Sequence, residues 1–250
     1  MPQTDTTVKR AASQVTRPLP QRWAAQPPMT QLRQRLQSDG FADMGVIDPI
    51  QSLSEVARGI AALISAAVVD APEQLEVSPR GAKGKNTYGG NYGLDALPFH
   101  TDLAHWHIPP RYVLLRGKVG SKAVQTRLIH RRDLEPSISA SLMKSTMFSP
   151  RRRLEGKMYL LHMLTDQLFR WDELFLEPKN QPAVEVRQRM LQLLPRIEAT
   201  NIVLDQPGHT LLIDNWHAMH GRGPVPATDT ARRLERIYLE DTTDGHEDPT

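Results

Sequence analysis

The chain has 250 residues, of which 39% are hydrophobic and 24% charged, and its formal net charge is +3. This length and balance suit one domain with its own hydrophobic core and, at most, a tail. The chain has no cysteine, which excludes disulfide scaffolds, thiolate metal sites and catalytic thiols, so a metal would bind mainly to His, Asp or Glu.

Helices are predicted near the start of the chain, after a tail. Residues 1–28 are rich in Thr, Gln, Pro and Arg and show little periodicity, so we expect a flexible tail there. Thr30–Asp39 has two leucines four residues apart and ends at Gly40, which predicts a short helix. Ser52–Val69 begins with a capping serine, carries Glu55 three residues later and has helical apolar spacing, so it predicts the clearest helix.

The remainder of the chain predicts mainly short strands joined by irregular loops. Residues 72–93 are rich in Gly, Asn, Lys and Pro and predict a long loop, which in a compact domain often carries function. A further helix is predicted at Ala183–Leu194, where Pro195 stops the apolar pattern. Strands are predicted at residues 40–47, Arg111–Arg116, Val124–His130, Ala199–Leu204, Thr210–Asp214 and Arg232–Glu240. This order fits one mainly β domain at residues 29–242, a sandwich or barrel with flanking helices, and a frayed tail at 243–250.

His100 and Asp102 form the first candidate for chemistry, because one residue separates them. On an extended strand, residues i and i+2 point to the same face, so this imidazole and this carboxylate would converge on one point. Such a pair can bind a metal ion. His-X-Asp is a common tripeptide, however, and taken alone it is more often a polar pair on the surface.

A second candidate motif leads from the apolar residues 211–213 through a turn to His220-Gly-Arg222. His220 would supply a third metal ligand. Two imidazoles and one carboxylate on one face of a metal are the facial triad of non-haem iron(II) oxygenases, which leaves positions open for an oxoacid and O2. By itself, His220 fits a histidine of the core or of a loop equally well.

Arginines follow this motif on a predicted strand. Arg232, Leu234 and Arg236 alternate, so they share one face of it. A guanidinium inside a sheet is costly unless it meets an anion, and it binds a carboxylate through two parallel hydrogen bonds. Arg232 is therefore a candidate for the far carboxylate of 2-oxoglutarate, and Arg236 for the substrate. The alternative is that both are solvated on an edge strand.

Together these motifs resemble the taurine dioxygenase (TauD/TfdA) superfamily, and most of all its clavaminate synthase-like and amino-acid hydroxylase branches. The resemblance covers roughly residues 85–240 and is carried by motifs in this order: His100–Asp102, Pro109–Arg116, Asp214–Arg222 and Arg232–Arg236. It implies a double-stranded β-helix (jelly-roll) core. It also implies an oxygenase that uses Fe(II), 2-oxoglutarate and O2 to hydroxylate or desaturate a small polar substrate, such as an amino acid or an amino-acid-derived intermediate. Succinate and CO2 would be the co-products.

The same resemblance implies roles for individual residues. The iron ligands would be His100, Asp102 and His220. Arg232, preferred over Arg233, would bind 2-oxoglutarate together with Thr126. The candidates for substrate binding are Arg236, Tyr88, Asn91 and Trp106. Phe169–Asp172 resembles an Arg-aromatic-Asp stretch of the amino-acid hydroxylases, but we assign it no role.

Other functions were weighed against the oxygenase. A metal-dependent hydrolase could use the same His/Asp/His ligands, but hydrolysis needs no arginine to anchor an oxoacid. A non-catalytic basic protein could bind nucleic acid through Arg151–Arg153, but the chain has no recognisable module and little net charge. With no apolar run of membrane-spanning length and no signal core, we expect a cytoplasmic protein with a small-molecule substrate and no membrane partner. The substrate, the role of Arg151–Arg153 and the oligomeric state, including a homo-oligomer, stay open.

Overall fold

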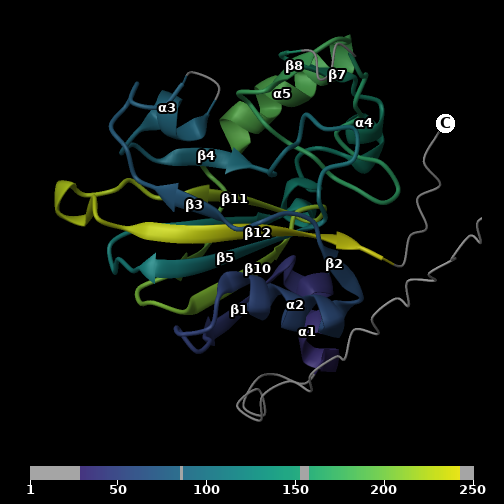
Figure 1. Cartoon of the computed structure of the whole chain (residues 1–250). Helices are drawn as coiled ribbons and strands as arrows, with labels where there is room; N and C mark the ends of the chain where they lie inside the picture. The colour runs from purple at the N-terminus through teal and green to yellow at the C-terminus, as the bar shows by residue number, and fades with distance from the viewer. Residues whose placement is uncertain (1–28, 85–86, 153–157, 243–250) are drawn as a thin grey trace, which may run out of the picture.

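The computed structural model describes residues 29–84, 87–152 and 158–242 (Figure 1). The predicted tails at 1–28 and 243–250 lie outside these residues. In chain order the elements are α1 (Met29–Asp39), β1 (Phe41–Val46), α2 (Leu53–Ile64), β2 (Ala66–Val68), β3 (Glu73–Glu76), α3 (Tyr88–Tyr92), β4 (Leu97–His100), β5 (Tyr112–Val119), β6 (Gln125–His130), α4 (Ala140–Lys144), β7 (Phe148–Pro150), β8 (Leu176–Pro178), α5 (Gln181–Leu193), β9 (Thr200–Val203), β10 (His209–Asp214), β11 (Ala218–Arg222) and β12 (Arg233–Asp241). None of the helices in the described part of the chain is long and apolar enough to cross a membrane.

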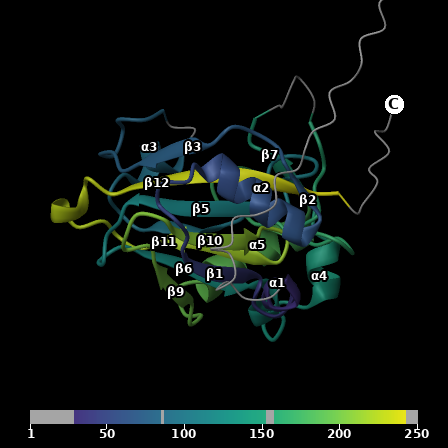
Figure 2. The same cartoon turned by 60° about the horizontal axis from the view of Figure 1, so that its bottom comes forward.

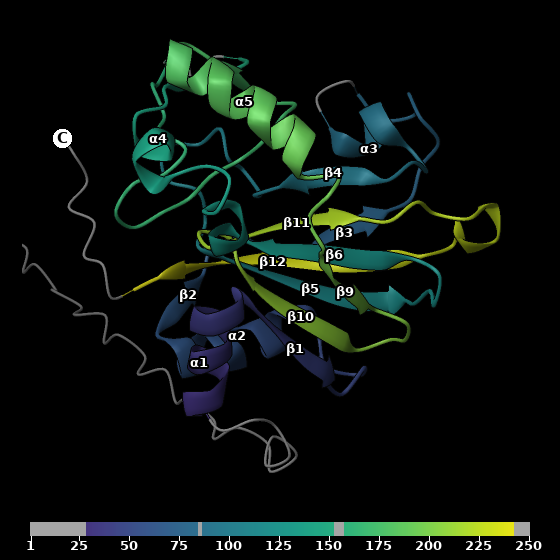
Figure 3. The same ribbon diagram turned by 180° about the vertical axis from the view of Figure 1, so that it is seen from behind.

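A larger and a smaller antiparallel sheet form the centre of the molecule. The larger sheet has the strand order β1-β10-β5-β12-β2, with β3 also paired to β12. The smaller sheet has the order β4-β11-β6-β9. Helices α1 and α2 lie beside the larger sheet, whereas α5 lies beyond the smaller one (Figures 1 and 3). The prediction of a mainly β domain with flanking helices is confirmed.

Strand β5 shows how the sequence builds these layers. Its side chains alternate between two apolar clusters, and both faces of the strand are buried. Tyr112 and Leu114 pack against α1 and α2 on the outer face, whereas Val113 and Leu115 pack toward the smaller sheet. Burying one such leucine contributes roughly 1.5–3 kcal/mol. The run predicted as a strand at Arg111–Arg116 therefore reads as almost continuously apolar because it has no solvent face.

Helix α2 starts where it was predicted to start but ends earlier. Ser52 and Glu55 form a capping box, in which each side chain accepts a hydrogen bond from the backbone N–H of the other residue. The helix was predicted to reach Val69, but it stops at Ile64 because Ser65 adopts the left-handed conformation (φ 58°). The chain then forms β2, whose backbone pairs with β12. Pairing at the sheet edge thus outweighs helical apolar spacing in this segment. Figure 2 shows α2 in front of the larger sheet.

The long loop predicted at residues 72–93 contains regular structure. Strand β3 pairs with β12, and α3 forms a short helix capped by the side chain of Thr87. The residues of β3 are mostly exposed, so the strand exists because β12 offers it hydrogen bonds. Both elements border the cavity described below.

Candidate active site

The two histidines predicted as metal ligands lie opposite each other on neighbouring strands. His100 is the last residue of β4, His220 lies within β11, and they are direct partners in the antiparallel pairing. The preceding residues, Phe99 and Met219, pack into the apolar cluster on the outer face of the smaller sheet. Alternation therefore turns both imidazoles inward. Gly221 allows the close approach of these strands, because a Cβ there would lie 2.8 Å from the carbonyl oxygen of Leu97.

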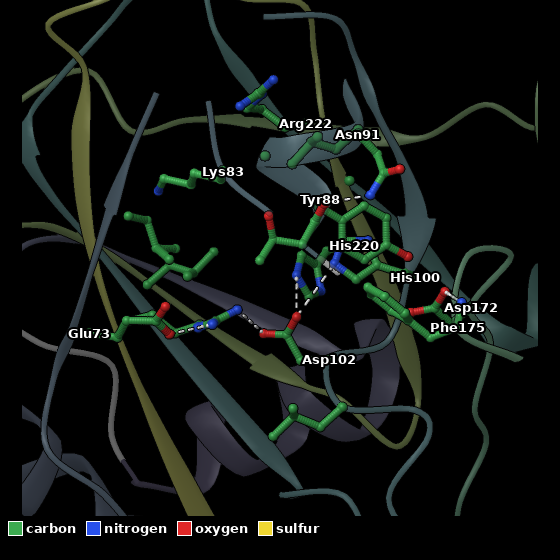
Figure 4. Close-up of a pocket in the computed structure, with 18 of the residues that line it drawn as sticks. Glu73, Lys83, Tyr88, Asn91, His100, Asp102, Asp172, Phe175, His220 and Arg222 are labelled. Atoms are coloured by element: carbon green, nitrogen blue, oxygen red, sulfur yellow. Dashed lines mark hydrogen bonds and ion pairs between the residues drawn. The ribbon is translucent and has the colours of Figure 1, made fainter. Parts of the chain in front are cut away.

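Asp102 completes the cluster, although it does not lie on a strand. The prediction placed it on an extended strand with His100, but β4 ends at His100 and the chain turns at Leu103, whose φ is +53°. The carboxylate still reaches the histidines. Its Oδ1 lies 3.4 Å from Nε2 of His100 and 3.6 Å from Nε2 of His220. One donor atom from each residue lies within 4.8 Å of the other two, and Figure 4 shows the side chains converging.

These donors fit one metal ion. Bonds of about 2.1 Å at right angles would separate two ligand atoms by roughly 3 Å, close to the observed distances. Nδ1 of His100 lies 2.9 Å from the carbonyl oxygen of Pro98, which can only accept, so Nδ1 carries a proton and Nε2 is the atom left to bind a metal. The set is two imidazoles and one carboxylate, which is the donor set of the mononuclear non-haem iron site.

The second oxygen of Asp102 is held by the larger sheet. Oδ2 accepts a hydrogen bond of 2.9 Å from Nη1 of Arg236 and one of 3.1 Å from the hydroxyl of Tyr238. The other Nη of Arg236 donates to Glu73 on β3. The carboxylate therefore has one oxygen engaged and the other turned toward the imidazoles. The sequence analysis missed Tyr238 and Glu73, although alternation along β12 puts Tyr238 on the face of Arg236.

The charges of the cluster suit a metal ligand set. Burial raises the pKa of Asp102, but Arg236 and the two histidines outweigh it and hold this pKa well below its usual range. Burial lowers the pKa of His220 to about 3, against the attraction of Asp102. Burial also opposes charge on His100, but its hydrogen bond and ion pair with Asp102 raise its pKa above the ordinary value. At neutral pH, Asp102 is charged and His220 neutral, as metal binding requires.

The cluster opens into a cavity of about 1030 Å³. Its walls include residues from both sheets, from α3 and from the segment 172–177. Predicted site residues that line it are His100, Asp102, His220, Arg232, Thr126, Arg236, Tyr88 and Asn91. The structure thus brings residues from distant parts of the chain to one space.

Arg232 and Thr126 lie in this cavity, and both are buried. Among the described residues no carboxylate pairs with Arg232, and its Nε has no hydrogen-bond partner. Burial and the nearby Arg222 lower the pKa of Arg232 to about 10, so it is still charged at neutral pH. Its neighbour Arg233 is exposed and does not line the cavity. The cavity therefore holds a buried cation for which the described residues supply no anion.

The predicted substrate residues differ in their placement. The ring of Tyr88 stacks on His100, with centroids 4.1 Å apart, and Asn91 lines the cavity from the same helix. Arg236 lines it too, although its guanidinium is engaged by Asp102 and Glu73. Trp106 is not among the lining residues, and its side chain is 39% exposed.

Arg170 holds the backbone of the loop that carries Trp106. Its buried guanidinium donates to the carbonyl oxygens of Ala104, Trp106 and His107, which fixes the loop that follows Asp102. Burial lowers the pKa of Arg170 to about 10. The sequence signal for this role was the Phe169–Asp172 stretch, to which no role had been assigned.

Asp172 is a further buried acid beside the cluster that the sequence analysis left without a role. Its Oδ1 accepts hydrogen bonds of 2.7 Å from the backbone N–H groups of Leu174 and Phe175. Burial raises its pKa, against the influence of His100 and these hydrogen bonds. Asp172 lines the cavity next to Tyr88 (Figure 4). Arg151 and Arg152 are exposed at the cavity, and Arg153 lies outside the described residues.

Comparison with known proteins identifies the fold. No protein-family model matches the chain, and neither does any curated protein. Solved structures of iron-dependent oxygenases share its fold. An asparagine oxygenase in complex with Fe(II), 2S,3S-3-hydroxyasparagine and succinate is 20% identical, with a TM-score of 0.65 over 86% of this chain and 80% of that chain.

A second similar structure is the non-heme iron oxygenase OrfP in complex with Fe, succinate and (3S)-hydroxy-L-Arg. It is 19% identical, with a TM-score of 0.64 over 85% of this chain and 79% of that chain. OrfP in complex with Fe and alpha-ketoglutaric acid gives a TM-score of 0.62 at 17% identity, over 85% of this chain and 79% of that chain. The predicted jelly-roll core is thereby confirmed. At these identities the likeness establishes the fold alone.

Proposed function

We propose that the protein is an Fe(II)- and 2-oxoglutarate-dependent oxygenase that hydroxylates an amino acid or an amino-acid-derived molecule, with succinate and CO2 as co-products. One observation carries the proposal. Two imidazoles and a carboxylate converge on one point, and a buried arginine, to which the described part of the chain offers no anion, faces the same cavity. The first feature suits iron(II), and the second suits the far carboxylate of a dicarboxylic oxoacid.

His100, Asp102 and His220 would hold the iron. When bound, the iron supplies O2 activation coupled to the oxidative decarboxylation of 2-oxoglutarate. The residues of this chain orient the site for that chemistry. The carbonyl of Pro98 sets the tautomer of His100, and Arg236 holds the carboxylate of Asp102 so that only Oδ1 faces the imidazoles.

Arg232 would bind the far carboxylate of 2-oxoglutarate, with Thr126 beside it on the cavity wall. The burial of Arg232 supports this role, because an ion pair that excludes water is stronger than one at the surface. Arg233 is exposed and would take no part. A metallohydrolase built on the same three ligands would leave the charge of Arg232 without a partner, so the oxygenase is the better fit.

The wall near the metal ligands suits a zwitterionic substrate. Asp172 and Arg236 provide opposite charges in one cavity, and Tyr88 and Asn91 reach this cavity from α3. Hydroxylation is supported by the compounds bound in the similar structures, which are 3-hydroxyasparagine and (3S)-hydroxy-L-Arg. Contact of Trp106 with substrate, a cytoplasmic location and the absence of a nucleic-acid partner remain predictions from the sequence.

Anaerobic titration tests the proposal directly. Fe(II) followed by 2-oxoglutarate should produce a weak visible charge-transfer band, and amino acids added with O2 should then release succinate. The matched control is Asp102→Ala, which removes one metal ligand and should abolish both signals. Full succinate formation by this variant would refute the ligand assignment. Iron binding without any band from 2-oxoglutarate would refute the oxygenase.

A further inference from the structure

The turn between β10 and β11 fastens the metal-binding segments to each other. Asn215, in this turn, is fully buried. Its Oδ1 accepts a hydrogen bond of 2.7 Å from the backbone N–H of Asp102, and its Nδ2 donates one of 3.0 Å to the carbonyl oxygen of the same residue. The residues are 113 positions apart in the chain. Asn215 also stands five positions before His220, so one side chain links the segments that carry these two ligands.

The side-chain amide of Asn215 acts as a strand partner would. Exchange of two hydrogen bonds with one residue is the pairing found between opposed residues of antiparallel strands. Asp102 has left β4 and has no such backbone partner. It also precedes Leu103, whose φ of +53° is an unfavourable conformation for a residue with a Cβ. Without the amide, the backbone that carries the carboxylate would be free to rotate.

The turn that carries Asn215 also binds residues 109–111, which follow Asp102 in the chain. The carbonyl oxygens of Pro109, Pro110 and Arg111 each accept a hydrogen bond from it, with donors Nε1 of Trp216, Nδ2 of Asn215 and the backbone N–H of Asn215. The two prolines have no N–H and cannot join a regular ladder. These hydrogen bonds therefore take the place of sheet pairing between the segment that follows Asp102 and the turn that precedes β11.

We propose that Asn215 is a positioning residue of the metal centre. It touches neither the metal ligands' donor atoms nor the cavity, and it acts through the backbone of Asp102. By fixing that backbone, it sets the position of Oδ1 of Asp102 relative to Nε2 of His100 and Nε2 of His220. The inference rests on the metal-binding part of the proposed function, but not on the use of 2-oxoglutarate.

Binding of Co(II), followed by its visible absorption, is the test. Asn215→Ala should weaken Co(II) binding about 10- to 100-fold and alter the ligand-field bands, as loss of a group that orients a ligand does. Asn180→Ala is the matched control. Asn180 likewise makes three hydrogen bonds to backbone groups, those of Ser145, Met147 and Ala183, and it caps α5 away from the metal ligands. It should lose stability but bind Co(II) as tightly as the unchanged protein.

The outcomes separate positioning from general stability. Equal Co(II) affinity of Asn215→Ala and the unchanged protein would overturn the inference, and so would an equal loss in Asn180→Ala. If Asn215→Ala does not fold, Asn215→Ser, whose hydroxyl can hold a water in the vacated space, should show the same loss of affinity. A folded Asn215→Ser with unchanged affinity would also overturn the inference.

The unchanged protein separates this inference from the proposed function. If it did not bind Co(II), both would be contradicted. Co(II) binding as expected, without a band from Fe(II) and 2-oxoglutarate, would sink the oxygenase alone.

Discussion

Two adjacent arginines, Arg232 just before β12 and Arg233 at its start, differ in their exposure to solvent. Arg232 is buried in the cavity and Arg233 is exposed, so the pair allows charge in the cavity to be changed separately from charge on the surface. Arg232→Gln should raise the KM for 2-oxoglutarate about 10- to 100-fold, because a hydrogen bond to a charged group contributes roughly 1.5–3 kcal/mol. Initial rates of succinate release measure the effect.

Arg233→Gln is the control for that experiment. It removes the same charge from the neighbouring residue, which is exposed. Its KM for 2-oxoglutarate should stay near that of the unchanged protein. Equal effects of the two substitutions would show that overall charge, and not an anchor in the cavity, governs 2-oxoglutarate binding.

His100 should make iron binding dependent on pH. Burial opposes its charged form, but Asp102 stabilises that form and raises the pKa of His100 above its ordinary value. A raised pKa means that the imidazole keeps its proton to higher pH, and Fe(II) has to displace that proton. The affinity for Fe(II), measured anaerobically from about pH 6 to 8, should therefore fall as the pH falls through the raised pKa. If the affinity for Fe(II) did not change over this pH range, the assignment of His100 as a ligand would be contradicted.

At the scale of an element, β12 serves the cavity and the core at once. Leu234, Arg236 and Tyr238 line the cavity, whereas Ile237 and Leu239 pack with α1 and α2 on the other face. Period-two alternation makes this possible in a strand with both faces covered. A substitution on the cavity face should therefore affect the chemistry. A substitution on the face that packs against α1 and α2 should affect the stability of the fold.

A substitution at the N-terminal cap of α2 tests whether stability on the outer side of the larger sheet is independent of metal binding. Ser52→Ala removes the side-chain oxygen that accepts from the backbone N–H of Glu55. The free energy of unfolding should fall by about 1 kcal/mol, and Tm by roughly 2–4 °C. Because α2 packs on the outer face of the larger sheet, Fe(II) affinity should not change. Thermal unfolding and metal titration on the same sample check both statements, and a loss of metal affinity would contradict the second.

At the scale of the whole molecule, the site exists only where the two sheets face each other. The smaller sheet carries His100 and His220, and the larger sheet carries Arg236 and Tyr238, which hold Asp102. A bound metal would thus bridge parts of the chain that separate on unfolding. Ligands that bind only the folded state stabilise it by mass action.

Iron removal should accordingly lower the stability of the protein. Free Fe(II) at 100 times its Kd would stabilise the fold by about 2.7 kcal/mol, which corresponds to a rise in Tm of roughly 5–10 °C. Anaerobic thermal unfolding with Fe(II) and then with excess chelator measures the difference. Asp102→Ala should show no such rise, and a rise equal to that of the unchanged protein would contradict the ligand set.

Part of the site was predictable because its signals are local in the sequence. His100 and Asp102 are separated by one residue, and Arg232 and Arg236 by three, so spacing suggested each pair. In the structure Asp102 and Arg232 lie just outside β4 and β12 and still reach the cavity. The partners of these residues were not predictable in the same way. Asn215 and Arg170 lie within motifs of the sequence, but nothing in the sequence shows that their side chains bind backbone groups more than 60 residues away.

The sequence by itself determined the elements whose signals come from neighbouring residues. These include the capped start of α2, the apolar run of β5, the alternation along β12 and the choice of the side chains proposed to bind the metal. Capping and alternation depend on groups a few residues apart, so they do not require knowledge of the fold.

Only the tertiary structure decided where those elements end and what their side chains meet. Residues 66–68 left the predicted helix because β12 offered them backbone hydrogen bonds, and β3 formed within a predicted loop for the same reason. Asp102 lies in a turn, yet it reaches the histidines because Asn215, Arg236 and Tyr238 hold it there. Hydrogen bonds and burial between distant residues depend on packing in three dimensions, and the order of residues along the chain does not specify them locally.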